Sequence, residues 1–444
     1  MAIYCQILLF IIALCPFQVL ATNEVSTVLT KTDSGIWRAH FSAKKPVKQI
    51  SFHRSPDSSR IKRWKATSAE FEILKINNDF EAVRRMDGKP FTEVEFGLTA
   101  SYVALPKDYA PFSPFSDGGM LLHSGRFFAC AEYCASEINQ WQLTIRAPKG
   151  DNIIVGGIVH SAEVRWLDSD SGQNVYVGKG APIADGNFVS LIDNKLPSAL
   201  KALMAQKLPK IVAYFAGKLP ALTYRPSLFA SYSATDDGSY GHQGGTLPGQ
   251  IFMHWYGQTA IEKLNEHETF WFFAHEIAHL YQGPAGSIDA LTDAWVHEGT
   301  AELFAGIAYT EINGSDRLLQ NKVENAKADC LRSVATESNY QKLALANSRV
   351  HYSCGLLIVD AINQELKQQG SDIFKLWQIF NDAVAKGKPA TATTFVEVSK
   401  PLLSENSFLK LAAFVKNDDV DAHQFFQELA TQQVKASRDS KLAN

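Results

Sequence analysis

Residues 270–280 read FWFFAHEIAHL, a continuous apolar run that carries two histidines and a glutamate. Residues four apart in a helix lie on the same face, so His275 and His279 can both point an imidazole nitrogen at one metal ion. Glu276 lies one position further round, where its carboxylate can reach a water on the metal without being a ligand. This stretch therefore predicts a helix that carries a catalytic metal site.

A further ligand is expected, because catalytic zinc takes three protein ligands and keeps a fourth position for water. After a turn at Gly283-Pro284, a second helical stretch begins, with Glu298 near its start and Glu302 one turn later. Helices joined by a tight loop run antiparallel, so Glu298 can face the histidines. Glu302 is expected to hold a ligand histidine in its tautomer, with a solvent-exposed acid as the alternative.

Together these motifs resemble those of the gluzincin metallopeptidases, specifically the aminopeptidase N family and its glycyl aminopeptidase relatives. Eighteen residues separate His279 from Glu298, and residues 295–302 read WVHEGTAE, which matches the family's Trp-x-x-Glu-Gly segment. The resemblance implies one Zn²⁺ per chain, held by His275, His279 and Glu298. It also implies that Glu276 is the base that deprotonates the attacking water.

Two further segments match motifs of the family, and each differs from its motif in at least one residue. The family's oxyanion-stabilising tyrosine lies in a Tyr-x-Lys-Gly segment, and residues 352–355 read YSCG. Tyr352 is therefore a candidate catalytic residue, with a buried core tyrosine as the alternative. The family's Gly-x-Met-Glu-Asn edge strand, whose glutamate holds the substrate amine, corresponds to Gly244-Gly245 without the glutamate. Backbone at a strand edge still pairs with an extended peptide, so Gly244 and Gly245 are expected to bind substrate.

The resemblance implies a zinc-dependent metallopeptidase that hydrolyses peptide substrates, and it favours aminopeptidase N-like activity. The missing glutamate leaves open an endopeptidase or oligopeptidase of the same fold that does not recognise a free N-terminus. A third hypothesis is an exported binding protein without turnover. The intact set of motif residues argues against it, because a purely structural role needs no general base.

The first segment of the chain predicts export. Residues 1–21 form an apolar run too short for a comfortable membrane span and end in Val19-Leu20-Ala21, which offers a small residue for cleavage. We interpret them as a signal peptide of a periplasmic or secreted protein. The four cysteines that remain fit an oxidising compartment, and their simplest pairing is Cys130 with Cys134 and Cys330 with Cys354, out of three connectivities. A second metal site at Cys130-x-x-x-Cys134 is the rival hypothesis.

Composition excludes several other classes of protein. The 444 residues are 46% hydrophobic and 20% charged, with a net charge of −3, as in a globular chain of two or three domains. The basic patches at 44–45 and 60–65 are short, so no nucleic-acid partner is expected. No later segment has the length and apolarity of a membrane helix, so no membrane anchor is expected. Oligomeric state is not determined by the sequence.

Patterning along the chain predicts an α+β fold in three parts. Period-two alternation between turn residues predicts a β-sandwich-like N-terminal domain over residues 22–191. A thermolysin-like (gluzincin) catalytic domain is expected over 192–316, and a helical region over 317–444. Within the catalytic domain we predict a helix over 196–208 and strands over 211–215 and 227–232. The later helices are predicted over 317–334, 350–367, 373–384 and 420–434.

Overall fold

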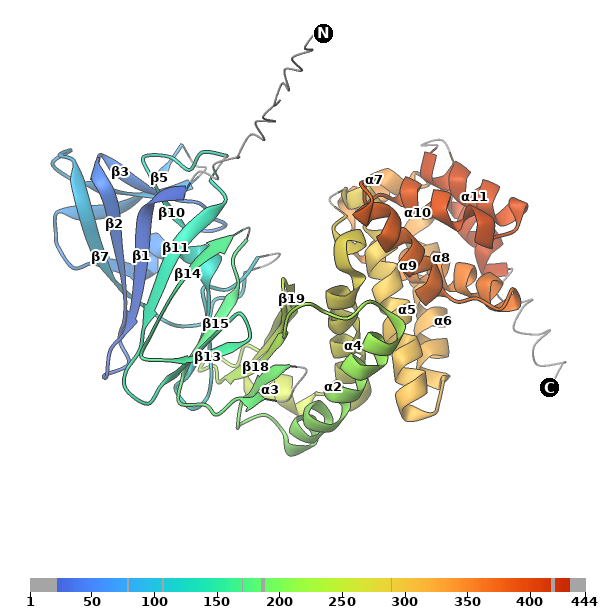
Figure 1. The fold of residues 1–444 in the computed structure, drawn as a ribbon, viewed down its shortest axis with the longest axis horizontal. Helices are drawn as coiled ribbons and strands as arrows, with labels where there is room; N and C mark the ends of the chain where they lie inside the picture. The colour runs from blue at the N-terminus through green and yellow to red at the C-terminus, as the bar shows by residue number, and fades with distance from the viewer. Residues whose placement is uncertain are drawn as a thin grey trace, which may run out of the picture.

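A computed structural model describes residues 22–431 apart from 78–79, 106–107, 137, 170, 185–187, 289 and 417–419. A β-rich part, a mixed sheet and a large group of helices follow one another along the chain (Figure 1). The expected signal peptide, residues 1–21, lies outside the described residues. None of the helices in the described part combines the length and the hydropathy that crossing a membrane requires.

The N-terminal part is a β-sandwich-like arrangement, as predicted. Its sheets have the strand orders β14-β11-β1-β2-β7-β4, β10-β3-β6-β5 and β13-β12-β15-β9-β8. In β2, alternate residues from Trp37 to Ala43 are buried, which is the period expected of a strand with one face in a core. The strands are β1 Thr22–Lys31, β2 Trp37–Val47, β3 Gln49–Phe52, β4 Trp64–Ala66, β5 Phe71–Ile76, β6 Phe80–Arg85, β7 Phe91–Leu98, β8 Phe112–Pro114, β9 Met120–His123, β10 Ala129–Ala131, β11 Gln140–Arg146, β12 Asn152–Val155, β13 Ile158–Ser161, β14 Glu163–Ser169 and β15 Asn174–Gly178, with a short helix α1 Ser59–Arg63.

The next sheet carries the glycine strand predicted from the sequence. Its order is β16-β17-β18-β20-β19, formed by Ile183–Ala184, Val189–Ile192, Ser227–Ser233, Gln250–Tyr256 and Gly241–Leu247 respectively. Strands β17, β18 and β20 are parallel, and β19 is antiparallel to β20. Within the described residues β19 pairs with β20 alone, so its other edge is open. Strands β16 and β17 belong to this sheet, so the sheet begins before residue 192, where the catalytic domain was predicted to start. The division of the chain into three domains stays a prediction.

The third N-terminal sheet, β13-β12-β15-β9-β8, shares an apolar contact with the mixed sheet that contains β19. Tyr176 of β15 and Leu121 of β9 are buried in one cluster with Phe229 of β18 and Phe252 of β20. The opposite face of the N-terminal strands packs into the sandwich core. The third N-terminal sheet is therefore covered on both faces, and this contact joins the β-rich part to the sheet that borders the site.

One predicted element differs from the structure. Residues 211–215, predicted as a strand, lie inside helix α2, Ser198–Lys218. The apolar β-branched run favours a strand locally, but Leu200, Met204, Leu208 and Phe215 continue one buried helical face into the main core. The prediction of a strand was wrong because packing overrides local propensity.

Helix α4, Glu266–Gln282, carries the His-Glu-x-x-His motif and is fixed at both ends. The side chain of Asn265 caps its first turn by accepting from the backbone N–H of His267 and Glu268. Gly283, with φ of 62°, ends it. Its apolar residues pack against α2 and against α5, Trp295–Asn313. The burial of this helix on several sides is what holds the motif in place.

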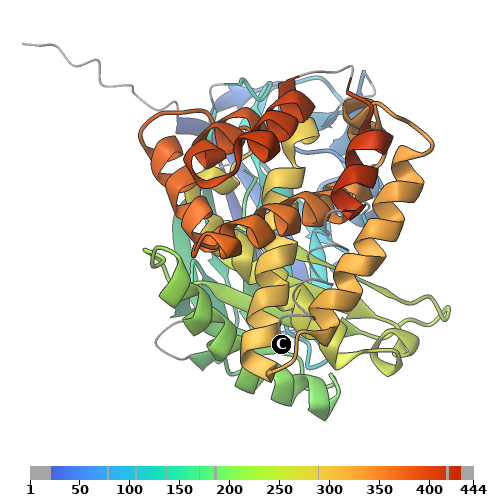
Figure 2. The ribbon, with the colours of Figure 1, turned by 90° about the vertical axis from the view of Figure 1, so that its right-hand side faces the viewer.

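Helices fill the remainder of the chain and pack around α5 (Figure 2). The predicted helices over 317–334, 350–367 and 373–384 are confirmed to within one residue at each end. The prediction over 420–434 coincides with helical residues 422–431, and its last residues lie outside the described part. The helices are α3 Gln258–Glu262, α5 Trp295–Asn313, α6 Arg317–Val334, α7 Tyr340–Ala346, α8 Arg349–Gln368, α9 Ile373–Ala385, α10 Ala392–Ser399 and α11 Glu405–Lys416.

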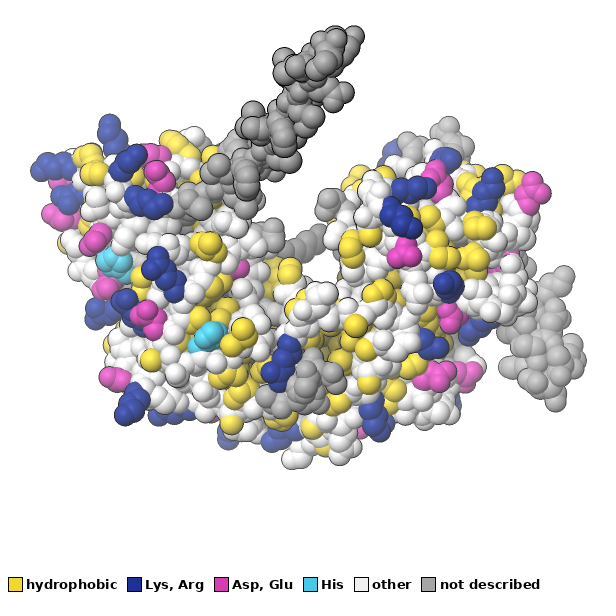
Figure 3. Space-filling model, in the orientation of Figure 1, with side chains coloured by type: hydrophobic (Ala, Val, Ile, Leu, Met, Phe, Trp, Pro, Cys, Tyr) yellow, Lys and Arg dark blue, Asp and Glu magenta, His cyan; other side chains and the backbone are white. Residues whose placement is uncertain are grey.

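Between the β-rich part and the helices the molecular surface is hollowed (Figure 3). Strand β19 lies between these two parts in the ribbon view (Figure 1). The fold thus places an open strand edge beside the motif helix.

Candidate metal centre

Three donor atoms predicted from the sequence converge on one point. His275 Nε2 and His279 Nε2 are 3.0 Å apart, and each lies 3.2 Å from Glu298 Oε2. Helix α4 supplies the two imidazoles on one face, and α5 supplies the carboxylate from its first turn. Among the described residues these three form a group whose ligand atoms could hold one metal ion.

The spacing of the three donor atoms fits a zinc ion. Zn–N and Zn–O bonds of about 2.0–2.2 Å in a tetrahedron separate neighbouring donors by roughly 3.3–3.6 Å. The observed separations of 3.0–3.2 Å are within a few tenths of an ångström of that value. Two imidazoles and one carboxylate are also the donor set of a catalytic zinc site that keeps a position open.

The cluster stabilises positive charge at its centre. Burial alone would lower the pKa of His275, but its contacts with Glu298 and Glu302 outweigh burial and raise that pKa well above the usual value. Burial would likewise raise the pKa of Glu298, but hydrogen bonds from the surrounding histidines hold it well below its usual range. A proton therefore competes for the point where the donor atoms converge, as expected at a metal site.

Glu302 lies behind His275, one turn after Glu298 on α5. Its Oε1 is 3.1 Å from His275 Nδ1, although the approach is not aligned as a hydrogen bond. Its Oε2 accepts a hydrogen bond of 2.7 Å from Trp271 Nε1. Burial opposes ionisation of Glu302, but these partners lower its pKa. The structure therefore places an ionised carboxylate against the side of His275 that faces away from the donor cluster.

Two glycines allow α5 and α8 to approach closely beside the cluster. A Cβ added to Gly299 would lie 2.3 Å from the carbonyl carbon of Gly355, and one added to Gly355 would lie 2.7 Å from Trp295 O. Gly299 directly follows Glu298, and Gly355 lies three residues after Tyr352. The glycine pair thus sets the distance between the helix that carries Glu298 and the helix that carries Tyr352.

Tyr352 faces the donor cluster from α8. Its ring centroid is 5.7 Å from that of His275, and the residue is 40% exposed, so it is not the buried core tyrosine of the alternative prediction. Partial burial and the negative charges of Glu298 and Glu276 raise the pKa of its phenol. The phenol therefore keeps its proton and is a hydrogen-bond donor at the border of the site.

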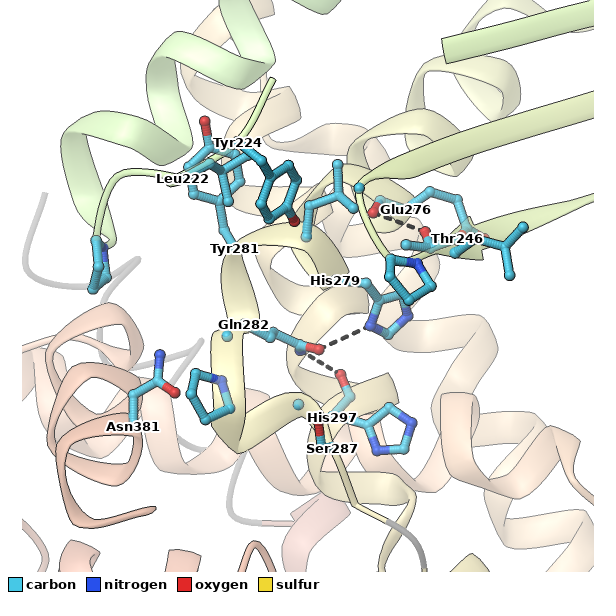
Figure 4. Close-up of a pocket in the computed structure, with 18 of the residues that line it drawn as sticks. Leu222, Tyr224, Thr246, Glu276, His279, Tyr281, Gln282, Ser287, His297 and Asn381 are labelled. Carbon is cyan, nitrogen blue, oxygen red and sulfur yellow. Dashed lines mark hydrogen bonds between the residues drawn. The ribbon is translucent and has the colours of Figure 1, made fainter. Parts of the chain in front are cut away.

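Glu276 points toward the strand edge instead of into the donor cluster. Its Oε2 accepts a hydrogen bond of 2.5 Å from the hydroxyl of Thr246, at the end of β19 (Figure 4). Gly244, Gly245 and Thr246 line the same cavity as His279 and Glu276. The cavity has a volume of about 880 Å³, which is in the range of ligand-binding pockets.

The sequence prediction missed two polar residues of the site, Thr246 and Gln282. Gln282, fully buried at the end of α4, lies 2.8 Å from His279 Nδ1 through its Oε1 and donates to His297 O over 2.7 Å through its Nε2 (Figure 4). His297 itself lines the cavity, 3.5 Å from Glu298 Oε1. The sequence offered only one signal for Gln282, a position one turn beyond His279.

Both predicted disulfides are present in the structure. Cys130 is bonded to Cys134, and Cys330 is bonded to Cys354. The second bridge links α6 to α8 two residues after Tyr352. The rival prediction of a metal site at Cys130 and Cys134 is therefore wrong in this structure, because both sulfurs are used in the bridge.

The fold and the donor set together match the arrangement expected from the sequence. A β-sandwich-like part, an edge strand beside a His-Glu-x-x-His helix, a glutamate on the following helix and a helical region form a gluzincin, aminopeptidase N-like arrangement. No protein-family model matches the sequence, and no curated protein matches it in sequence. Solved structures do match.

An aminopeptidase N family protein from Idiomarina loihiensis superposes with a TM-score of 0.61 at 12% identity, covering 91% of this chain and 78% of that one. An M1 zinc metallopeptidase mutant from Deinococcus radiodurans, bound to a Tyr-Ser-Ala substrate, matches with a TM-score of 0.50 at 10% identity, covering 90% of this chain and 94% of that one. Yeast LTA4 hydrolase in complex with bestatin matches with a TM-score of 0.51 at 12% identity, covering 90% and 67%. The chain shares the fold of these proteins.

Proposed function

We propose that this chain is an exported zinc-dependent metallopeptidase that hydrolyses peptide bonds, with aminopeptidase N-like activity. The observation that carries the proposal is the convergence of His275 Nε2, His279 Nε2 and Glu298 Oε2 beside Glu276, in a cavity bordered by an open strand edge. The neighbours of the same fold include a metallopeptidase bound to a peptide substrate. Export is supported by two disulfides and by the character of residues 1–21.

Each residue has a distinct task in this proposal. His275, His279 and Glu298 would hold one Zn²⁺, which as a Lewis acid lowers the pKa of water and polarises a carbonyl oxygen. Glu276, held by the Thr246 hydroxyl, accepts the proton of the attacking water and returns it to the leaving amine. The neutral phenol of Tyr352 donates a hydrogen bond to the oxygen on which negative charge develops.

The strand edge would hold the peptide. The backbone of Gly244 and Gly245 on β19 is free to add an extended substrate as a further strand, because β19 pairs with β20 alone among the described residues. Such pairing uses backbone hydrogen bonds and does not depend on the side chains of the peptide. It brings a peptide carbonyl past Thr246 and Glu276, which line the same cavity.

A second candidate is an endopeptidase or oligopeptidase of the same fold. Strand β19 reads GHQGGTL and contains no acidic residue that could hold a free amine. Thr246, close to where the resemblance places that glutamate, is bonded to Glu276 instead. The two candidates differ in one property, namely whether a free N-terminus is required.

One peptide in two forms, with a free and with an acetylated N-terminus, distinguishes them. The mature protein is incubated with zinc, alongside Glu276→Gln as the blank and Glu266→Gln, an exposed glutamate of the same helix, as the matched control. Loss of general base catalysis should lower the rate by about 10²- to 10⁴-fold in Glu276→Gln while zinc stays bound. Glu266→Gln should hydrolyse at the wild-type rate.

Cleavage of the free form alone would support aminopeptidase activity, and equal cleavage of both forms would support the endopeptidase. If the wild-type protein binds zinc but cleaves neither form of several peptides, the chain is a binding protein and the proposed hydrolysis is wrong. Near-normal hydrolysis by Glu276→Gln would refute the role of Glu276 as base.

A further inference from the structure

The carboxamide of Gln282 connects the two helices that carry the predicted zinc ligands. It lies at the last residue of α4, three residues after His279, and is fully buried. Its Nε2 reaches the backbone carbonyl of His297 in the first turn of α5, directly before Glu298. Figure 4 shows the side chain between the His279 ring and His297. One amide group thus touches both sides of the site.

The backbone carbonyl of His297 determines which way the amide points. A carbonyl oxygen only accepts hydrogen bonds, so the NH₂ group of Gln282 faces it over 2.7 Å. The amide oxygen is then the atom that lies 2.8 Å from His279 Nδ1. Because that oxygen also only accepts, Nδ1 of His279 carries the proton. The lone pair of the ring is left on Nε2, the atom that joins the donor cluster.

We propose that Gln282 is a positioning residue that fixes the tautomer and the ring orientation of His279 and thereby raises the zinc affinity of the site. The inference rests on the proposed zinc site but concerns a residue outside the matched motifs. Partners on the far nitrogen of a ligand histidine orient the ring and raise its basicity, and their loss typically costs about 10- to 100-fold in metal affinity. Gln282 makes this contact with good alignment, whereas the contact of Glu302 with His275 is not aligned.

An amide is required here because the residue must accept on one side and donate on the other. A carboxylate could still accept from His279 but would face the His297 carbonyl without a proton to donate. A thioether of similar length would do neither. The variants Gln282→Glu and Gln282→Met therefore separate the contact that sets the tautomer from the contact that links the helices.

A backbone contact at the same residue provides a matched control. Trp377 Nε1 donates to the backbone carbonyl of Gln282 over 3.0 Å, and the indole is fully buried in the core. Trp377→Phe removes this bond and leaves the Gln282 carboxamide in place. If zinc affinity simply followed the stability of the fold, Trp377→Phe would weaken zinc binding as well, so the control shows whether the two quantities separate.

The experiment measures the dissociation constant of Zn²⁺ by competition with a chromophoric chelator, together with thermal unfolding, for the wild type and the three variants. We expect Gln282→Met to bind zinc about 10- to 100-fold more weakly than wild type. Gln282→Glu should recover most of that affinity although its unfolding temperature falls. Trp377→Phe should unfold at a lower temperature and bind zinc as the wild type does.

The outcomes separate this inference from the proposed function. If the wild type itself binds no zinc, the proposed metallopeptidase site is wrong. If the wild type binds zinc and Gln282→Met binds it equally well, Gln282 does not position His279. Should Gln282→Met fail to fold, Gln282→Glu decides: an affinity reduced by about 10-fold or more would overturn the acceptor role.

Discussion

Replacing Gly299 by alanine tests how closely α5 and α8 must approach to form the site. The added Cβ would lie 2.3 Å from the carbonyl carbon, 2.5 Å from the carbonyl oxygen and 2.6 Å from Cα of Gly355. Nonbonded carbon atoms prefer about 3.5–4.0 Å, so the helices must separate by roughly 1 Å. Overpacking of this kind costs about 1–3 kcal/mol of unfolding free energy.

The same displacement acts on the chemistry, because α5 carries Glu298 and α8 carries Tyr352. A misplacement of about 1 Å among positioning groups costs about 100-fold in rate. Urea unfolding gives the stability, and peptide hydrolysis under conditions where the variant stays folded gives kcat/KM. We expect Gly299→Ala to lose about 1–3 kcal/mol and about 100-fold in kcat/KM.

Gly217→Ala is the matched control. Gly217 lies near the end of α2, and a Cβ there would meet no described atom within 4 Å beyond its own surroundings. Alanine has the higher helix propensity, so this variant should gain up to about 1 kcal/mol with unchanged kcat/KM. If Gly299→Ala were as stable and as active as Gly217→Ala, the close approach of the two helices would not be what places Glu298 against Tyr352.

Two further predictions concern stability. Burial raises the pKa of Asp360 to about 6 from 3.8, so the folded state resists ionisation of this carboxyl group. The wild type should therefore lose about 2 to 3 kcal/mol of unfolding free energy between pH 4 and pH 7 through this group. Urea unfolding at the two pH values should show that Asp360→Asn removes this loss, and a pH profile identical to that of the wild type would contradict the prediction. Replacing Cys330 and Cys354 by alanine should lower the unfolding free energy by about 3 kcal/mol, because the bridge closes a loop between residues 24 apart; an unchanged urea midpoint would show that the bridge adds nothing.

Much of the predicted site depended on one helix and one spacing. His275 and His279 share a face because helical geometry is regular. Glu298 was predicted as the third donor because it lies in the first turn of the next helix. The helix over 317–334 was predictable for the same reason, since its buried residues Ala326, Cys330 and Val334 recur once per turn.

Other features depend on contacts between distant segments. Residues 211–215 look like a strand locally but continue the buried face of α2. The bond between Thr246 and Glu276 exists because β19 lies beside α4, and Gln282 meets His297 because α5 begins beside the end of α4. Neither pair has a characteristic spacing in the sequence, so the sequence predicted the cluster of donor atoms but not Thr246 and Gln282, which contact Glu276 and His279.

Anomalous diffraction at the zinc absorption edge, from crystals of the protein grown with zinc, would test the central claim most directly. We predict one zinc peak per chain within about 2.0–2.2 Å of His275 Nε2, His279 Nε2 and a carboxylate oxygen of Glu298. A zinc peak that is bound by Glu302 in place of Glu298, or the lack of any peak at these residues, would contradict the proposed metal centre.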